Sequence, residues 1–188
     1  LEGYVADDIE WVRAKEVCRN LEPGKNPKLF AGKIEPADLR RQGVLGNCWL
    51  LAALAALAEH PVVIRKCFLN REYNSRGKYR VSLYDGLQRR WVIIVIDDYI
   101  PVKAGTKEPI FVWPNGEELW AMLLEKAFAK FYGSYAGLDG GQMIGALFQM
   151  TGDHCFAFMV ENNGYWKRYD AFFDNQREIE RYIDKDDD

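Results

Sequence analysis

An uninterrupted apolar run of eleven residues, from Cys48 to Ala58, constrains the fold of this chain more than any other feature. Alanine and leucine dominate the run, and both are strong helix formers. Because no polar face interrupts it before Glu59, the helix should be covered by other elements. Pro61 marks its expected end, and the run is too short to span a bilayer. We therefore predict a buried central helix over residues 48–60.

The composition is that of an ordinary globular protein. The 188 residues suit one domain with one core. The net charge is −3, and residues of both signs are interspersed along the chain. Because no basic stripe appears, we do not expect nucleic acid as a partner. The first residues contain no signal peptide, and we expect no transmembrane segment.

Cysteine usage favours a reducing compartment. No two cysteines form a CxxC pair, and zinc-ligand spacing is absent. A chain of this size with a full core does not need disulfides, so we expect a cytoplasmic protein. The four cysteines are Cys18, Cys48, Cys67 and Cys155.

Two further patterns complete an α+β fold. Residues 78–84 alternate apolar and polar side chains, and residues 91–96 form a β-branched run typical of a strand buried on both faces. A turn at Asp85-Gly86 should join them as a hairpin. Residues 117–132 have the spacing of an amphipathic helix, with Glu125, Lys126 and Lys130 on its outer face.

The two ends of the chain are less regular. Residues 1–41 should be an extended, loop-rich segment with one short helix around residues 9–18. Glycines make the stretch after residue 132 loop-rich, and a second hairpin is predicted from residues 155–160 and 165–169 around an Asn-Gly turn. Residues 184–188 form an acidic tail or linker. The core subdomain is thus assigned to residues 42–183.

The junction before the central helix carries the chemistry. Asn47 is a competent N-cap residue, which places Cys48 in the first helical turn. Unpaired backbone N–H groups and the positive end of the helix dipole favour a thiolate there, and the thiolate is the nucleophilic form. Gln42, six residues upstream, could supply a second donor to an oxyanion. The alternative is that Cys48 is only a small core residue.

This segment resembles the catalytic-cysteine motif of the calpain family of cysteine proteases, whose fold is papain-like. The resemblance continues in order through two further segments and covers about residues 30–152. It implies that this chain is the first of two protease subdomains, with Cys48 as nucleophile and Gln42 at the oxyanion. A histidine and an asparagine would come from a second subdomain, and the substrates would be polypeptides. The matching segments are QGVLGNCWLLAALAAL, VIIVIDDYIPVKAG and NGEELWAMLLEKAFAKFYGSYAGLDGG.

The family resemblance also implies a calcium site. Glu118 matches an acidic ligand of the family, and Asp38 matches a second one if the loop absorbs one extra residue before Gln42. Calcium takes six to eight oxygens, so two carboxylates need backbone carbonyls near Gly32 and water to complete a site. We expect weak calcium binding or none, and two solvated surface acids are the alternative. In another departure, Asn47 stands where most calpains have Asp.

Two histidines are available as a base within the chain. His60 is twelve residues beyond Cys48 on the predicted helix, roughly 18 Å along its axis, and suits a helix C-terminus. His154 begins an apolar strand and is the candidate base of a self-sufficient papain-like peptidase. The preferred hypothesis takes the base from the missing subdomain, so that this chain alone is inactive. A non-catalytic interaction module related to calpains is the third possibility.

Overall fold

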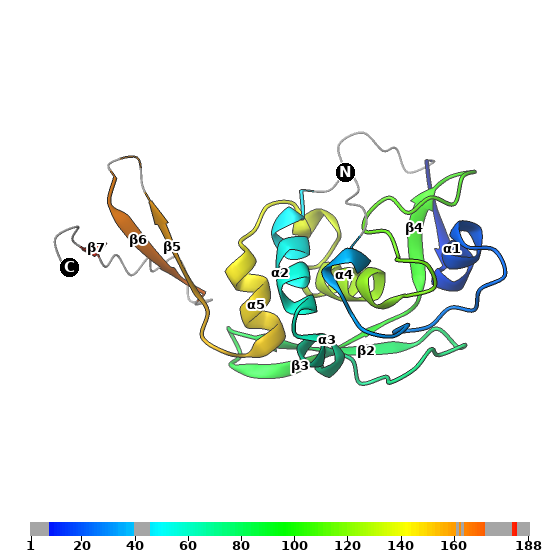
Figure 1. Ribbon diagram of the computed structural model, residues 1–188, viewed down its shortest axis with the longest axis horizontal. Helices are drawn as coiled ribbons and strands as arrows, with labels where there is room; N and C mark the ends of the chain where they lie inside the picture. The colour runs from blue at the N-terminus through cyan, green and yellow to red at the C-terminus, as the bar shows by residue number, and fades with distance from the viewer. Residues whose placement is uncertain (1–7, 40–45, 161, 163, 172–181, 184–188) are drawn as a thin grey trace.

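A computed structural model describes residues 8–39, 46–160, 162, 164–171 and 182–183 of the chain. These residues form five α-helices and short antiparallel strands, which confirms the predicted α+β class. Figure 1 shows the helices and two small sheets gathered in one body, from which a hairpin projects at the C-terminal end. The division of the chain at residues 41/42 stays a prediction.

Helix α2 (Cys48–Ala58) occupies the middle of this body, as predicted. It packs against α5 (Met143–Thr151), α3 (Pro61–Cys67) and the short 3-10 turn η2 (Pro36–Asp38). The expectation of burial on every side was wrong, because Cys48, Ala52 and Ala56 lie on one exposed face at a spacing of four residues. Small side chains can face water at little cost, which lets an apolar helix keep one open side.

The end of α2 also differs from the prediction. The helix ends at Ala58, and Pro61 begins α3 after a sharp turn instead of only ending the first helix. Proline suits the first position of a helix because the missing N–H is not needed there. Among the described residues no single helix has the length and hydropathy to cross a membrane; α2 and α3 meet that test only as a pair bent by 119°.

The first described segment is a strand followed by a helix, not the single helix predicted over residues 9–18. Strand β1 (Ile9–Arg13) pairs antiparallel with β4 (Tyr99–Lys103), and α1 (Ala14–Leu21) follows it directly. The tertiary partner overrides the local pattern here. The junction is held by an Arg13–Asp98 ion pair and by the Ala14 N–H, which donates to the Asp98 carbonyl at 2.7 Å.

Strands β2 (Tyr79–Asp85) and β3 (Arg90–Ile96) form the predicted hairpin. The expectation that β3 is buried on both faces was wrong, since Trp91, Ile93 and Val95 are exposed. The two strands make a two-stranded sheet, and α4 packs against β3. The intervening residues of β3 are partly or fully buried. A continuous β-branched run therefore hid an ordinary alternation of buried and exposed positions.

Helix α4 (Trp120–Phe131) is the predicted amphipathic helix, shortened by three residues at its start. The prediction that Glu125 lies on the outer face was wrong, because its side chain is 2% exposed and belongs to the interior. Two N–H donors explain how a carboxylate can be buried there, as described below. After α4 come the 3-10 turn η3 (Ala136–Leu138) and then α5, which the glycine-rich sequence did not predict.

The C-terminal hairpin is confirmed. Strands β5 (Phe156–Val160) and β6 (Trp166–Asp170) pair antiparallel, and β7 (Tyr182–Ile183) pairs with β6. Glu161 and Asn163 of the predicted turn and the acidic tail lie outside the described residues. The hairpin extends away from α5 in Figure 1. It carries several exposed large apolar side chains: Phe156, Phe158, Met159, Val160, Tyr165 and Trp166.

Candidate active site

Cys48 is the first residue of α2, and its side chain is exposed. The carbonyl of the preceding residue, Asn47, accepts the N–H groups of Leu50 and Leu51 at 3.0 and 3.1 Å and so begins the helix. The Asn47 side chain does not cap the helix, although the residue occupies the predicted N-cap position. Cys48 thus stands among the first-turn amides, which have no acceptor within the helix.

The residues on both sides of Cys48 are tied to the segment that runs from α4 to α5. The Gly46 carbonyl accepts the Gly140 N–H at 3.0 Å. After Cys48, the Trp49 indole Nε1–H donates to the Leu138 carbonyl at 2.9 Å, and the indole is almost fully buried. These two hydrogen bonds hold Cys48 from either side while its own sulfur stays accessible.

Glycine is needed at one position beside Trp49. A Cβ added to Gly141 would lie 2.6 Å from Cδ2 and 2.7 Å from Nε1 of Trp49, closer than van der Waals contact allows. The indole cannot swing aside without breaking its hydrogen bond to Leu138. The absence of a side chain at Gly141 therefore leaves room for the Trp49 ring beside Cys48.

A buried polar pair forms the third tether. Asn47 Nδ2–H donates to Glu125 Oε1 at 2.6 Å, and the other carboxylate oxygen accepts the Val112 N–H at 3.2 Å. Burial raises the pKa of Glu125 to about 7, and the two hydrogen bonds oppose that rise. This pair could not be predicted from the sequence because Glu125 has the helical neighbours of a surface residue. An Asn directly before the cysteine was the only signal for it.

The four cysteines differ sharply in access. Cys18 and Cys67 are buried, and burial raises the pKa of each thiol to about 12. Cys155 is partly exposed, and burial raises its pKa as well. Among the described residues, Cys48 is the one cysteine that is exposed.

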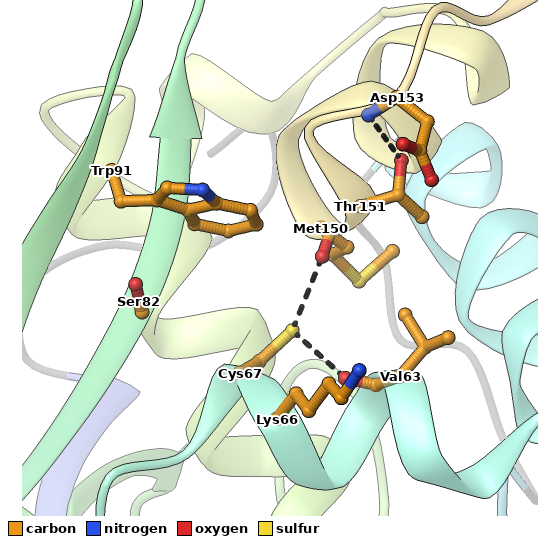
Figure 2. A pocket seen from close by; sticks show the side chains of 8 residues that line it. All are labelled: Val63, Lys66, Cys67, Ser82, Trp91, Met150, Thr151 and Asp153. Carbon is orange, nitrogen blue, oxygen red and sulfur yellow. Dashed lines mark hydrogen bonds between the residues drawn. The ribbon is translucent and has the colours of Figure 1, made fainter.

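The largest contrast with Cys48 is Cys67. Figure 2 shows its thiol at the floor of a cavity of about 310 Å³ between α3, β3 and the end of α5. The sulfur lies 3.4 Å from the Val63 carbonyl and 3.8 Å from the Met150 carbonyl. A thiol held in this way is protonated and shielded, which makes it a poor nucleophile.

Neither histidine lies near Cys48. His60 precedes α3, beyond the end of α2 and not in its last turn as expected. Asp153, next to His154, lines the cavity of Figure 2 together with α3. His154 therefore belongs to the end of α2 that is opposite Cys48, and eleven helical residues separate the two ends by roughly 16 Å. Its Nε2 lies 2.9 Å from Oδ1 of Asp170.

Gln42, the predicted oxyanion donor, lies outside the described residues. The two predicted calcium ligands are described, and both are buried. Asp38 accepts the Asn115 Nδ2–H and the Glu35 N–H, each at 2.8 Å. Glu118 accepts the Ala31 N–H and, at 3.3 Å, the Trp120 indole N–H.

These two carboxylates lie close together. Burial raises the pKa of Glu118, and the charge of Asp38 adds to that rise against the opposing Ala31 hydrogen bond. Two close carboxylates are an oxygen donor set of the kind that calcium accepts, although every carboxylate oxygen already accepts an N–H. Among the described residues no cluster of three or more Asp, Glu, His or Cys side chains is arranged for a metal ion. The pair thus supplies two of the six to eight oxygens that calcium needs, and its role in binding calcium stays a prediction.

Comparison with known proteins agrees with this geometry. The sequence profile described as "Calpain family cysteine protease" matches residues 3–181. The calpain-type cysteine protease ADL1 of Oryza sativa is 38% identical over 143 residues, which are 76% of this chain and 6% of that protein. The calpain-2 catalytic subunit of Bos taurus is 36% identical over 148 residues, 77% of this chain and 20% of that protein. The chain thus spans a fifth or less of these relatives.

Proposed function

Because this chain belongs to the calpain family of cysteine proteases, we propose that it contributes the cysteine-bearing half of an active site that hydrolyses peptide bonds. Cys48 is the proposed nucleophile. The observation that carries this proposal is an exposed thiol in the first turn of α2, held between Gly46 and Trp49, which are both tied to neighbouring elements. The setting we propose is the cytoplasm.

The proposed reaction begins when the Cys48 thiolate attacks the carbonyl carbon of a polypeptide substrate. A carbon–sulfur bond forms, and the carbonyl electrons move to the oxygen. The Cys48 backbone N–H and the Gln42 side chain donate to this oxyanion. The carbon–nitrogen bond then breaks as the leaving amine takes a proton from a histidine, and water hydrolyses the thioester.

The histidine and its asparagine partner come, in this proposal, from a second protease subdomain. The distance between the two ends of α2 supports this source over His154, which belongs to the wrong end for a hydrogen bond to the Cys48 sulfur. A non-catalytic module would need neither an exposed cysteine nor its tethers. Asp38 and Glu118 are proposed as a weak calcium site that links α4 to the segment before Gln42.

Thiol labelling tests the nucleophile directly. The purified chain is treated with a limiting amount of iodoacetamide at pH 7.5, and the alkylated peptides are quantified by mass spectrometry. We expect Cys48 to react first and Cys155 to follow, with Cys18 and Cys67 protected until the chain is unfolded. The Cys155→Ser variant is the matched control and should leave the rate at Cys48 unchanged. Preferential labelling of any other cysteine would contradict the proposal.

A further inference from the structure

The polar pair behind the nucleophile is unusual for a protein interior. Asn47 is 1% exposed and Glu125 is 2% exposed, so both polar groups have been taken out of water. Desolvating a carboxylate and an amide costs free energy that hydrogen bonds only partly return, whereas two apolar side chains of similar size would pack without this cost. General stability is therefore a poor explanation for the pair.

The pair fixes the relative position and orientation of two elements. An apolar contact tolerates sliding, but a hydrogen bond of 2.6 Å between Asn47 Nδ2 and Glu125 Oε1 fixes the separation and orientation of the two groups. The backbone carbonyl of the same Asn47 accepts the first two N–H bonds of α2. One residue thus joins the start of α2 to the middle of α4.

Glu125 is itself held in place. Its second oxygen accepts the Val112 N–H from the loop after β4, so the carboxylate bridges two segments that do not include α2. Among the described titratable side chains, Tyr135 is affected by the charge of Glu125. Burial is the main cause of its raised pKa, and the charges of Glu125 and Asp97 add to it. The Glu125 carboxylate is therefore held in place by Val112, and it can in turn hold the Asn47 side chain in one position.

We propose that Glu125 is a positioning residue for the nucleophile: its buried carboxylate holds the Asn47 amide and thereby fixes the first turn of α2, which presents the Cys48 sulfur. This inference rests on the proposed role of Cys48. Glu125 does not touch the reacting atoms and acts only through Asn47. The Gly46 and Trp49 tethers hold the neighbouring backbone and ring, and Glu125 sets the turn between them.

Hydrogen exchange on the full 188-residue chain tests the tether without relying on activity. Exchange is measured by mass spectrometry at pH 8 on the peptide that contains the Leu50 and Leu51 amides, which donate to the Asn47 carbonyl in the first turn of α2, with a β2 peptide as internal reference. The Asn47→Ala variant removes the N–H donated to Glu125 and adds no charge. We expect exchange in the first turn to rise on the order of tenfold or more, with β2 unchanged, because a buried hydrogen bond is lost.

Exchanging the amide and the carboxylate between positions 47 and 125 should restore the hydrogen bond. In the double variant Asn47→Asp with Glu125→Gln, the Gln amide can donate to Asp while its oxygen accepts the Val112 N–H. We expect protection of the first turn to return to within about twofold of the wild-type value. Asn47→Leu, which keeps a side chain of similar size but cannot donate, should loosen the first turn as Asn47→Ala does. It keeps the test decisive if Asn47→Ala does not fold.

The control separates positioning from general stability. Asp98→Asn removes the charge of a buried carboxylate and so weakens its ion pair with Arg13, which lies away from α2. It should lower global stability and leave the relative exchange of the first turn unchanged. The inference is overturned if both single Asn47 variants retain wild-type protection, or if the double variant is no better protected than Asn47→Ala. If instead Cys48 is not the preferred site of alkylation while the exchange results hold, the proposed function fails and the tether stands.

Discussion

The ionisation of Glu125 gives the sharpest quantitative prediction. Its pKa is about 7 in the folded chain against 4.5 for an ordinary glutamate, because the side chain is buried. Between these values the folded state holds a proton that the unfolded state has released. The contribution of Glu125 to stability is therefore fully present below pH 4.5 and is lost as the pH rises through 7.

The size of this effect follows from the shift. Each pKa unit corresponds to about 1.4 kcal/mol, so a rise from 4.5 to about 7 predicts that wild type loses about 3 kcal/mol of unfolding free energy across this window through Glu125 alone. Glu125→Gln removes the titration. The amide oxygen of the introduced Gln accepts one of the two N–H bonds at every pH, so the variant is offset from wild type by a constant amount and also lacks the pH-dependent fall that Glu125 causes.

Urea unfolding at half-unit steps from pH 4.5 to 8, followed by tryptophan fluorescence, measures the two curves. The fall in stability with rising pH should be about 3 kcal/mol smaller in Glu125→Gln than in wild type. The remaining slope includes Glu118, whose pKa is also raised by burial. Glu59→Gln, the same change at an exposed position, should run parallel to wild type. Parallel curves for Glu125→Gln and wild type would refute the reasoning.

Three further outcomes are expected. A thiol-dependent assay with a fluorogenic peptide should detect no turnover by this chain alone; activity lost in His154→Ala would instead favour a self-sufficient peptidase. Calorimetric titration should find weak calcium binding or none, and a micromolar site abolished by Glu118→Gln would contradict this. Gly141→Ala should lower the unfolding free energy by about 1–3 kcal/mol, because the new methyl group meets the Trp49 ring. Gly46→Ala, whose methyl meets the movable end of the Asp139 side chain, should cost less in the same denaturation assay.

Helices and hairpins with strong local periodicity could be predicted from the sequence. The apolar run of α2, the spacing of α4 and the two hairpins all depend on neighbours close in the chain. Strand β1 could not be predicted, because it exists through pairing with β4, about ninety residues away. The open faces of α2 and β3 were missed for a related reason. An apolar sequence does not reveal which side remains uncovered.

In the candidate site too, features with a local sequence signal could be predicted, and contacts between distant residues could not. The position of Cys48 at the start of a helix could be predicted because a loop-to-helix junction has a local signature, and its catalytic role stays a proposal. Its tethers were missed, since Glu125, Leu138 and Gly140 lie 77 to 92 positions farther along the chain and carry no motif for this contact. Gln42 lies outside the described residues, so its role stays a prediction. The close approach of Asp38 and Glu118 agrees with their expected pairing, and their binding of calcium remains a proposal.

The three tethers around Cys48 have a mechanical consequence. Glu125, Leu138 and Gly140 all belong to one continuous stretch of chain, from the middle of α4 to the loop before α5. The start of α2 is therefore coupled through three hydrogen bonds to a single stretch of chain. A displacement of α4 and its following loop would pull on Gly46, Asn47 and Trp49 together, and so would move the backbone on both sides of Cys48.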